Sequence, residues 1–63
     1  MKYTIYEYTY VGENLKTIQY FYGKTGNNDF EGQKDFKAIK QANTVKQAKK
    51  IISELEEIYI KLN

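Results

Sequence analysis

Two short segments of this 63-residue chain contain residue types that could do chemistry. Residues 23–25, Gly-Lys-Thr, are the types that end a phosphate-binding loop, and Tyr22 and Lys24 are groups that can exchange protons. Residues 27–32, Asn-x-Asp-x-Glu-Gly, place oxygen ligands at alternate positions before a glycine, as a calcium-binding loop does. The chemistry to consider is therefore phosphate binding, calcium binding and proton transfer.

Each of these patterns lacks a residue that its chemistry needs. A phosphate loop requires a glycine at the position of Ile18, and a calcium loop requires a carboxylate at the position of Ala38. The chain also has no His and no Cys. His is the usual general base, Cys is the usual thiol nucleophile, and together they supply most ligands of transition metals. We therefore expect no enzyme, with no catalytic residue, no metal site and no cofactor.

The composition predicts one small folded domain, residues 1–63. The hydrophobic share is 41% and the aromatic share 16%, at a net charge of only +2, which is too apolar for a disordered chain. No apolar run approaches the roughly 18 residues of a membrane span, and the start does not resemble a secretory signal, so we expect a cytoplasmic protein. Abundant Lys, Asn, Ile and Tyr without Arg are typical of an AT-rich genome. We expect a low-GC bacterium or one of its phages as the source.

Aromatic and β-branched residues dominate the first third of the chain. Residues 2–11 and 15–22 have the pattern of two strands joined by a Gly-Glu-Asn turn, and residues 36–40 have that of a short third strand. Residues 23–34 hold three of the four glycines, which predicts a long surface loop. The predicted order is strand, strand, loop, strand.

The last third of the chain predicts one amphipathic helix, residues 45–62. Thr44 and Gln47 have the spacing of a capping box, in which the Thr44 hydroxyl accepts from the backbone N–H of residue 47. Apolar residues then recur at steps of three and four, and they are Val45, Ala48, Ile51, Ile52, Leu55, Ile58, Tyr59 and Leu62. The fold class is therefore α+β, a three-stranded antiparallel sheet with the C-terminal helix on one face.

The register of the first hairpin decides which sheet face stays open. A three-residue loop, with Val11 opposite Leu15, puts the tyrosines of both strands on one face, and we favour this arrangement, with those tyrosines under the helix. A two-residue loop, Glu13-Asn14, instead puts Ile5, Val11, Ile18, Tyr20 and Tyr22 together, opposite Tyr6, Tyr8, Tyr10 and Phe21. In that alternative the second group is an open aromatic platform that binds a protein or stacks on bases.

Lysines concentrate around the start of the helix. Residues 34–50 contain six Lys against one Asp, a local charge of 6 − 1 = +5. Lysine near a helix N-terminus opposes the helix dipole, so folding alone does not favour it there. A phosphate-binding function would favour lysines at this place. The residues of the predicted patch are Lys37, Lys40, Lys46, Lys49 and Lys50. A solvated face with pairs such as Lys50 with Glu54 is the alternative.

The strand pattern together with Thr-x-x-Gln-Ala at residues 44–48 resembles the arm-DNA-binding domains of phage and transposon integrases, and small free-standing phage proteins of similar arrangement. The resemblance covers most of the chain. It implies a helix on one sheet face and a second face that enters DNA. It implies no base-reading residue here, because that family uses Arg, and this chain has none.

These observations leave two binding functions open. The first is protein–protein interaction, for example as a phage-encoded inhibitor or modulator of a host or defence protein, and the near-neutral charge favours it. The second is a nucleic-acid-binding accessory protein that uses the lysine patch on DNA or RNA. A homodimer is a third expectation, formed through the uncovered sheet face, through Ile60, or by pairing of an exposed first or third strand.

Overall fold

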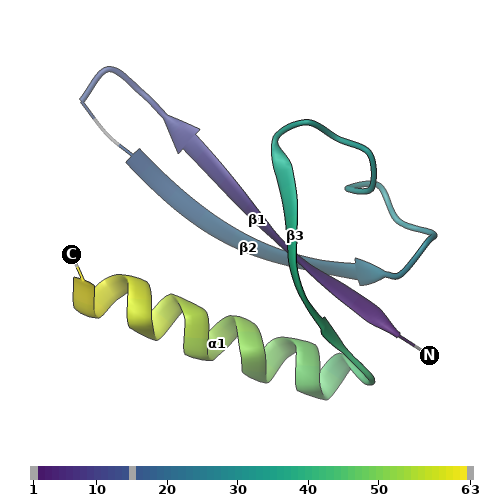
Figure 1. The fold of residues 1–63 in the computed structure, drawn as a ribbon. Helices are drawn as coiled ribbons and strands as arrows, with labels where there is room; N and C mark the ends of the chain where they lie inside the picture. Colours follow the sequence, from purple (N-terminus) through teal and green to yellow (C-terminus); the bar gives the residue numbers. More distant parts are fainter. Residues whose placement is uncertain (1, 15, 63) are drawn as a thin grey trace.

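Three strands and one helix follow each other along the chain (Figure 1). The structure, a computed structural model, describes residues 2–14 and 16–62, and the side chains of these as far as residue 58. The elements are β1 (Tyr3–Val11), β2 (Lys16–Lys24), β3 (Phe36–Ala42) and α1 (Val45–Leu62). The predicted α+β fold is confirmed, and the helix has the predicted bounds.

The sheet is antiparallel with the order β2-β1-β3, so the first strand lies in the middle. The expectation that the first strand could be an exposed edge is therefore wrong. The reason is that the long loop between β2 and β3 crosses the sheet, so that β3 pairs with the free side of β1. On its other side, β1 is paired with β2 through nine residues. The edges of the sheet are β2 and β3.

The hairpin has the register of the two-residue loop, with Val11 opposite Lys16 and Tyr6 opposite Phe21. The favoured three-residue arrangement is wrong. The observed pairing puts Ile5 and Tyr22 on the helix side and the β1 tyrosines Tyr6, Tyr8 and Tyr10 on the other, because side chains alternate along a strand. A turn that is one residue shorter thus exchanges the two faces of β1 relative to the faces of β2.

The helix covers the face that contains Ile5. Ile5 and Ala48 are fully buried, and Ala42 at the end of β3 is 5% exposed. Partly buried apolar side chains surround these three, and they are Tyr3, Tyr22, Ile39, Ile51, Ile52 and Leu55. The helical stripe of the sequence thus packs in the core as far as Leu55, whereas Ile58 is 55% exposed. The side chains of Tyr59, Ile60 and Leu62 lie outside the described part.

The start of α1 is capped by its own side chains. The N–H of Gln47 donates to the Thr44 hydroxyl at 3.1 Å, as the capping box predicts. The return bond goes one residue further back than expected, since the Gln47 side-chain oxygen accepts from the Asn43 N–H at 2.9 Å. The N–H of Gln47, one of those that a helix start leaves without an intrahelical partner, is thereby satisfied, and so is the N–H of Asn43 just before the helix.

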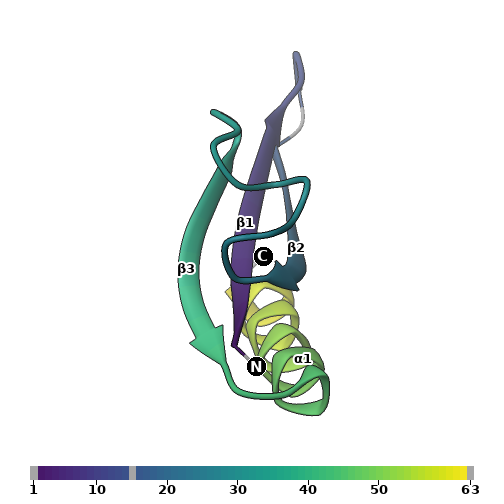
Figure 2. The same cartoon turned by 90° about the vertical axis from the view of Figure 1, so that its right-hand side faces the viewer.

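The molecule is thin, with extents of 39 × 25 × 12 Å (Figure 2). Its radius of gyration is 12.2 Å, whereas a compact domain of this length has about 10.6 Å. Among the described residues, no helix has the length and apolar character needed to cross a bilayer.

Candidate interaction surfaces

A cluster of aromatic rings occupies the sheet face opposite the helix. Tyr6, Phe21 and Tyr8 come from β1 and β2, Phe36 from β3 and Phe30 from the loop. The ring centroids of Phe30 lie 5.6 Å from Tyr6, 5.5 Å from Phe21 and 4.9 Å from Phe36, and Tyr8 lies 5.0 Å from Phe36. Such spacings are typical of packed aromatic pairs. This face is therefore a second small core, closed by the loop of residues 25–35.

Asn28 fixes that loop to the sheet. Its side-chain N–H₂ donates to the Tyr6 hydroxyl at 3.0 Å and to the Lys24 carbonyl at 2.8 Å. Its side-chain oxygen accepts from the N–H groups of Phe30 and Glu31 at 2.8 and 2.9 Å. The Asn28 side chain approaches so closely that a Cβ on Gly23 would lie 2.6 Å from the Cβ of Asn28. Glycine at position 23 thus permits the anchor.

The open aromatic platform predicted for the two-residue register is therefore covered at its centre. Tyr6 is 5% exposed and its hydroxyl is hydrogen-bonded, while Tyr8 and Phe21 are half-buried. Of the four predicted platform residues, only Tyr10 is largely exposed, at 55%. The sequence does not reveal this cover, because Phe30, the one large apolar residue of the glycine-rich loop, meets the sheet only in the folded molecule.

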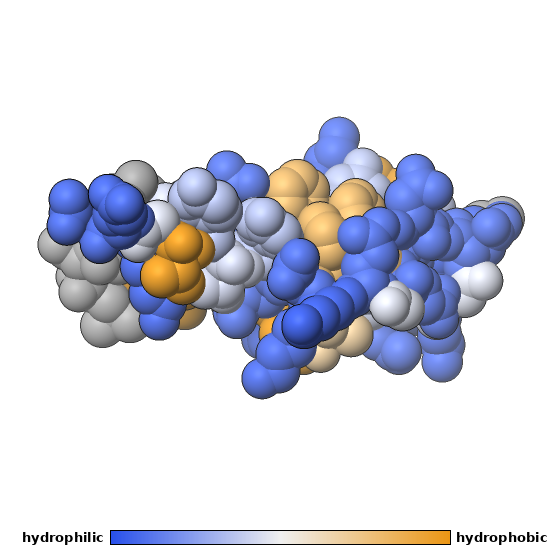
Figure 3. Space-filling view, turned by 90° about the horizontal axis from the view of Figure 1, so that it is seen from above, coloured by the Kyte–Doolittle hydropathy of each residue, from blue (hydrophilic) through white to orange (hydrophobic). Residues whose placement is uncertain are grey.

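Beyond the third strand the hairpin projects as a two-stranded arm, residues 9–11 paired with residues 16–18 (Figure 1). The arm exists because β3 begins at Phe36, opposite Tyr8, so the last three residues of β1 have only one neighbouring strand. Tyr10 lies on one face of this arm, and Val11, which is 71% exposed, lies on the other. Figure 3 shows an isolated hydrophobic spot toward the hairpin end, separate from the hydrophobic area in the middle.

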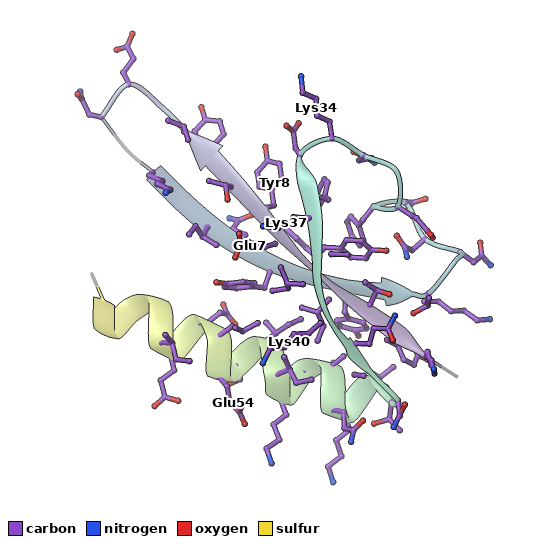
Figure 4. All side chains as sticks on the ribbon, in the orientation of Figure 1. Glu7, Tyr8, Lys34, Lys37, Lys40 and Glu54 are labelled. Carbon is purple, nitrogen blue, oxygen red and sulfur yellow. The ribbon has the colours of Figure 1, made fainter. Side chains whose placement is uncertain are left out.

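The predicted lysine patch is exposed but divided between two elements. All five lysines, Lys37, Lys40, Lys46, Lys49 and Lys50, are solvent-exposed. The three lysines of α1 lie outside the apolar stripe that packs on the sheet. Lys37 of β3 lies directly opposite Glu7 of β1, and Figure 4 shows these two side chains on adjacent strands. An opposite charge across the strand pair partly offsets the positive field there.

A shallow depression of about 500 Å³ lies where β3 meets the helix. Its walls combine two lysines and one carboxylate with amide and apolar groups, and they are Lys2, Gln41, Ala42, Asn43, Gln47, Lys50, Ile51 and Glu54. Ile58, which is 55% exposed, lies further along the same helix, outside the depression. Among the residues that the structure describes, no three acidic side chains come together as a metal site.

Comparison of the chain with protein-family models, with curated proteins and with solved structures finds no match.

Proposed function

We propose that this chain is a small non-enzymatic binding protein that acts by protein–protein interaction. The observation that supports the proposal is the projecting hairpin arm, on which Tyr10 and Val11 are 55% and 71% exposed. Tyrosine is enriched in the binding hot spots of protein interfaces, and Val11 adds exposed apolar surface on the other face of the same strand. The centre of the aromatic face is covered, so the arm is where apolar contact with a partner is offered.

The placement of charge favours a protein partner over nucleic acid. Lys37 is opposed by Glu7, and the helix lysines are followed by Glu54, Glu56 and Glu57. Nucleic acid binding depends on several lysines that contact phosphates together. A partner recognised by apolar side chains with few net charges fits the overall charge of +2 better.

The proposed class of partner rests on composition and on the order of the elements. Abundant Lys, Asn, Ile and Tyr without Arg are typical of an AT-rich genome, and small phage proteins of similar arrangement exist. The proposed role is to inhibit or modulate a host or defence protein. An inhibitor needs no catalytic group, because occupying a surface of its target is sufficient.

The test compares two variants that change opposite features. In Tyr10→Ser/Val11→Ser the arm loses its two exposed large apolar side chains, and in Lys46→Glu/Lys49→Glu/Lys50→Glu the start of the helix loses its positive charges. Each chain is immobilised and exposed to nuclease-treated lysate of a low-GC bacterium. Proteins retained by the wild type are purified and titrated against all three chains by calorimetry.

We expect a partner whose affinity falls at least about tenfold for the arm variant and changes little for the helix variant or with salt. Direct titration of mixed-sequence duplex and single-stranded DNA and RNA completes the test. Nucleic acid binding that weakens steeply with salt and disappears in the helix variant would overturn the proposal in favour of the accessory role.

A further inference from the structure

The two edges of the sheet are protected to different degrees. An exposed strand edge offers unpaired N–H and C=O groups to other strands, and proteins protect such edges with lysines and bulges. On β3 the register shifts opposite Ile5, and Lys37 and Lys40 lie within the strand. On β2 the seven residues 17–23 contain no charge, and lysines stand only at its two ends. The interior of β2 thus lacks the protecting charges and the register shift that β3 has.

The molecule exposes more surface than a compact monomer of its mass, which leaves area for an interface. The chain exposes 5045 Å², whereas a compact monomer of 7.5 kDa exposes about 4,200 Å². The excess is about 800 Å², which equals what one partner buries in an interface of standard size.

We propose that the occupant of the β2 edge is a second copy of this chain, paired antiparallel across a two-fold axis. The pairing joins two sheets into one of six strands, β3-β1-β2-β2-β1-β3. The pairing uses the β2 edge, which includes residues 16–18 of the arm, but it does not use the side chains of Tyr10 and Val11 on β1. Either proposal can therefore fail without the other.

The register of the pairing follows from the side chains of β2. An axis through Tyr20 would set Lys16 opposite Lys24 of the second copy, and like charges in direct opposition destabilise a strand pair. An axis through Gln19 sets Lys16 opposite Tyr22 instead. Gln19 is exposed, and its amide, which both donates and accepts, then meets its own copy in a self-complementary pair.

The position of the helix is compatible with pairing through β2. α1 packs most extensively on β2 and lies under the β2 side of the sheet (Figure 2). With strands about 4.8 Å apart, two helices that each lie beneath a β1–β2 pair are separated by about 9.6 Å, within the usual 8–10 Å of helix packing. The helix flank away from the depression at β3 contains Lys49, Ile52 and Glu56. Antiparallel helices then place Lys49 of each copy near Glu56 of the other.

The first experiment measures mass by sedimentation equilibrium from about 5 to about 500 µM. We expect a species of 2 × 7.5 = 15.0 kDa for the wild type. Gln19→Lys places two lysines opposite each other at the axis and shifts the protein to monomer. The matched control is Gln41→Lys, the same change at an exposed glutamine of the other edge strand, and it leaves the dimer intact.

The second experiment locates the edge. The chain contains no cysteine, so Gln19→Cys and Gln41→Cys each introduce a single thiol. Under mild oxidation Gln19→Cys forms a covalent dimer, since directly opposed Cβ atoms are about 5 Å apart. Gln41→Cys does not, because the β3 strands lie about 24 Å apart in a six-stranded sheet. A monomer throughout the concentration range, or faster cross-linking through Gln41→Cys, would overturn the proposal.

Discussion

At the scale of single residues, Asn28 connects the loop to the sheet. It makes four hydrogen bonds, to the Tyr6 hydroxyl, the Lys24 carbonyl and the N–H groups of Phe30 and Glu31. Tyr6 is 5% exposed, so its hydroxyl has little access to water if Asn28 is removed. One amide side chain therefore positions the ring of Phe30 over the aromatic face.

We predict that Asn28→Ala lowers the free energy of unfolding by about 2–3 kcal/mol, because several hydrogen bonds are lost, one of them to a buried hydroxyl. Urea unfolding followed by circular dichroism measures the change. The neighbouring Asn27→Ala is the control, since Asn27 uses only its backbone N–H, which donates to the Lys24 carbonyl at 3.0 Å. Equal stability of the Asn28 and Asn27 variants would contradict the anchoring role.

At the scale of elements, the helix contributes the apolar stripe that closes the main core. Leu55 is half-buried and packs against the buried cluster, whereas Ile58, one turn later, is 55% exposed. The two residues have the same number of carbon atoms and lie on the same helix. A comparison of their alanine variants therefore separates the stability lost with packing from the stability changed by helix propensity.

We predict that Leu55→Ala lowers the free energy of unfolding by about 2–4 kcal/mol, while Ile58→Ala changes it by less than about 1 kcal/mol. Chemical denaturation of the two variants beside the wild type measures both values. A Leu55→Ala protein as stable as the wild type would show that the helix stripe is not the core.

The charges of the helix run against its dipole, since its first turn contains no acidic residue and Lys46 lies there. We predict that Lys46→Glu raises the free energy of unfolding by about 0.3–1 kcal/mol, because a carboxylate near the N-terminus interacts favourably with the unpaired N–H groups. Thermal unfolding at low salt detects it, and added salt reduces it. The same change at Lys34, in the loop, is the control. A loss of stability at position 46 would mean that Lys46 makes a favourable contact of its own.

At the scale of the whole molecule, the chain has little core for its surface. Four apolar residues are buried among the described part of the chain, namely Ile5, Tyr6, Ala42 and Ala48, and the molecule is 12 Å thick along its shortest axis. A domain of this size buries only about 60% of its unfolded surface, so its stability is small unless association adds to it.

We predict that the melting temperature rises with protein concentration, by several degrees between about 5 and 500 µM, because association stabilises the folded state by mass action. Differential scanning calorimetry at the two concentrations measures it. The Gln19→Lys variant should show no such dependence. A wild-type melting temperature independent of concentration would mean that the isolated chain supplies all of its own stability.

The amino-acid sequence by itself determined the helix, its cap and the three strands. The bounds of α1 follow from apolar spacing and from Thr44 and Gln47, which interact with groups only three or four residues away. The strands follow from runs of β-branched and aromatic residues, and only their ends moved, as when β3 continued to Ala42. These features are local, and local interactions are visible in the order of residues.

Only the tertiary structure decided the faces and the edges of the sheet. The hairpin register depends on the total burial of two alternative sets of side chains, and the turn is compatible with both. The covering of Tyr6 depends on Asn28 and Phe30, more than twenty residues away, and the central position of β1 depends on a loop that crosses the sheet. Contacts between distant segments are chosen by packing in three dimensions, which no spacing along the chain records.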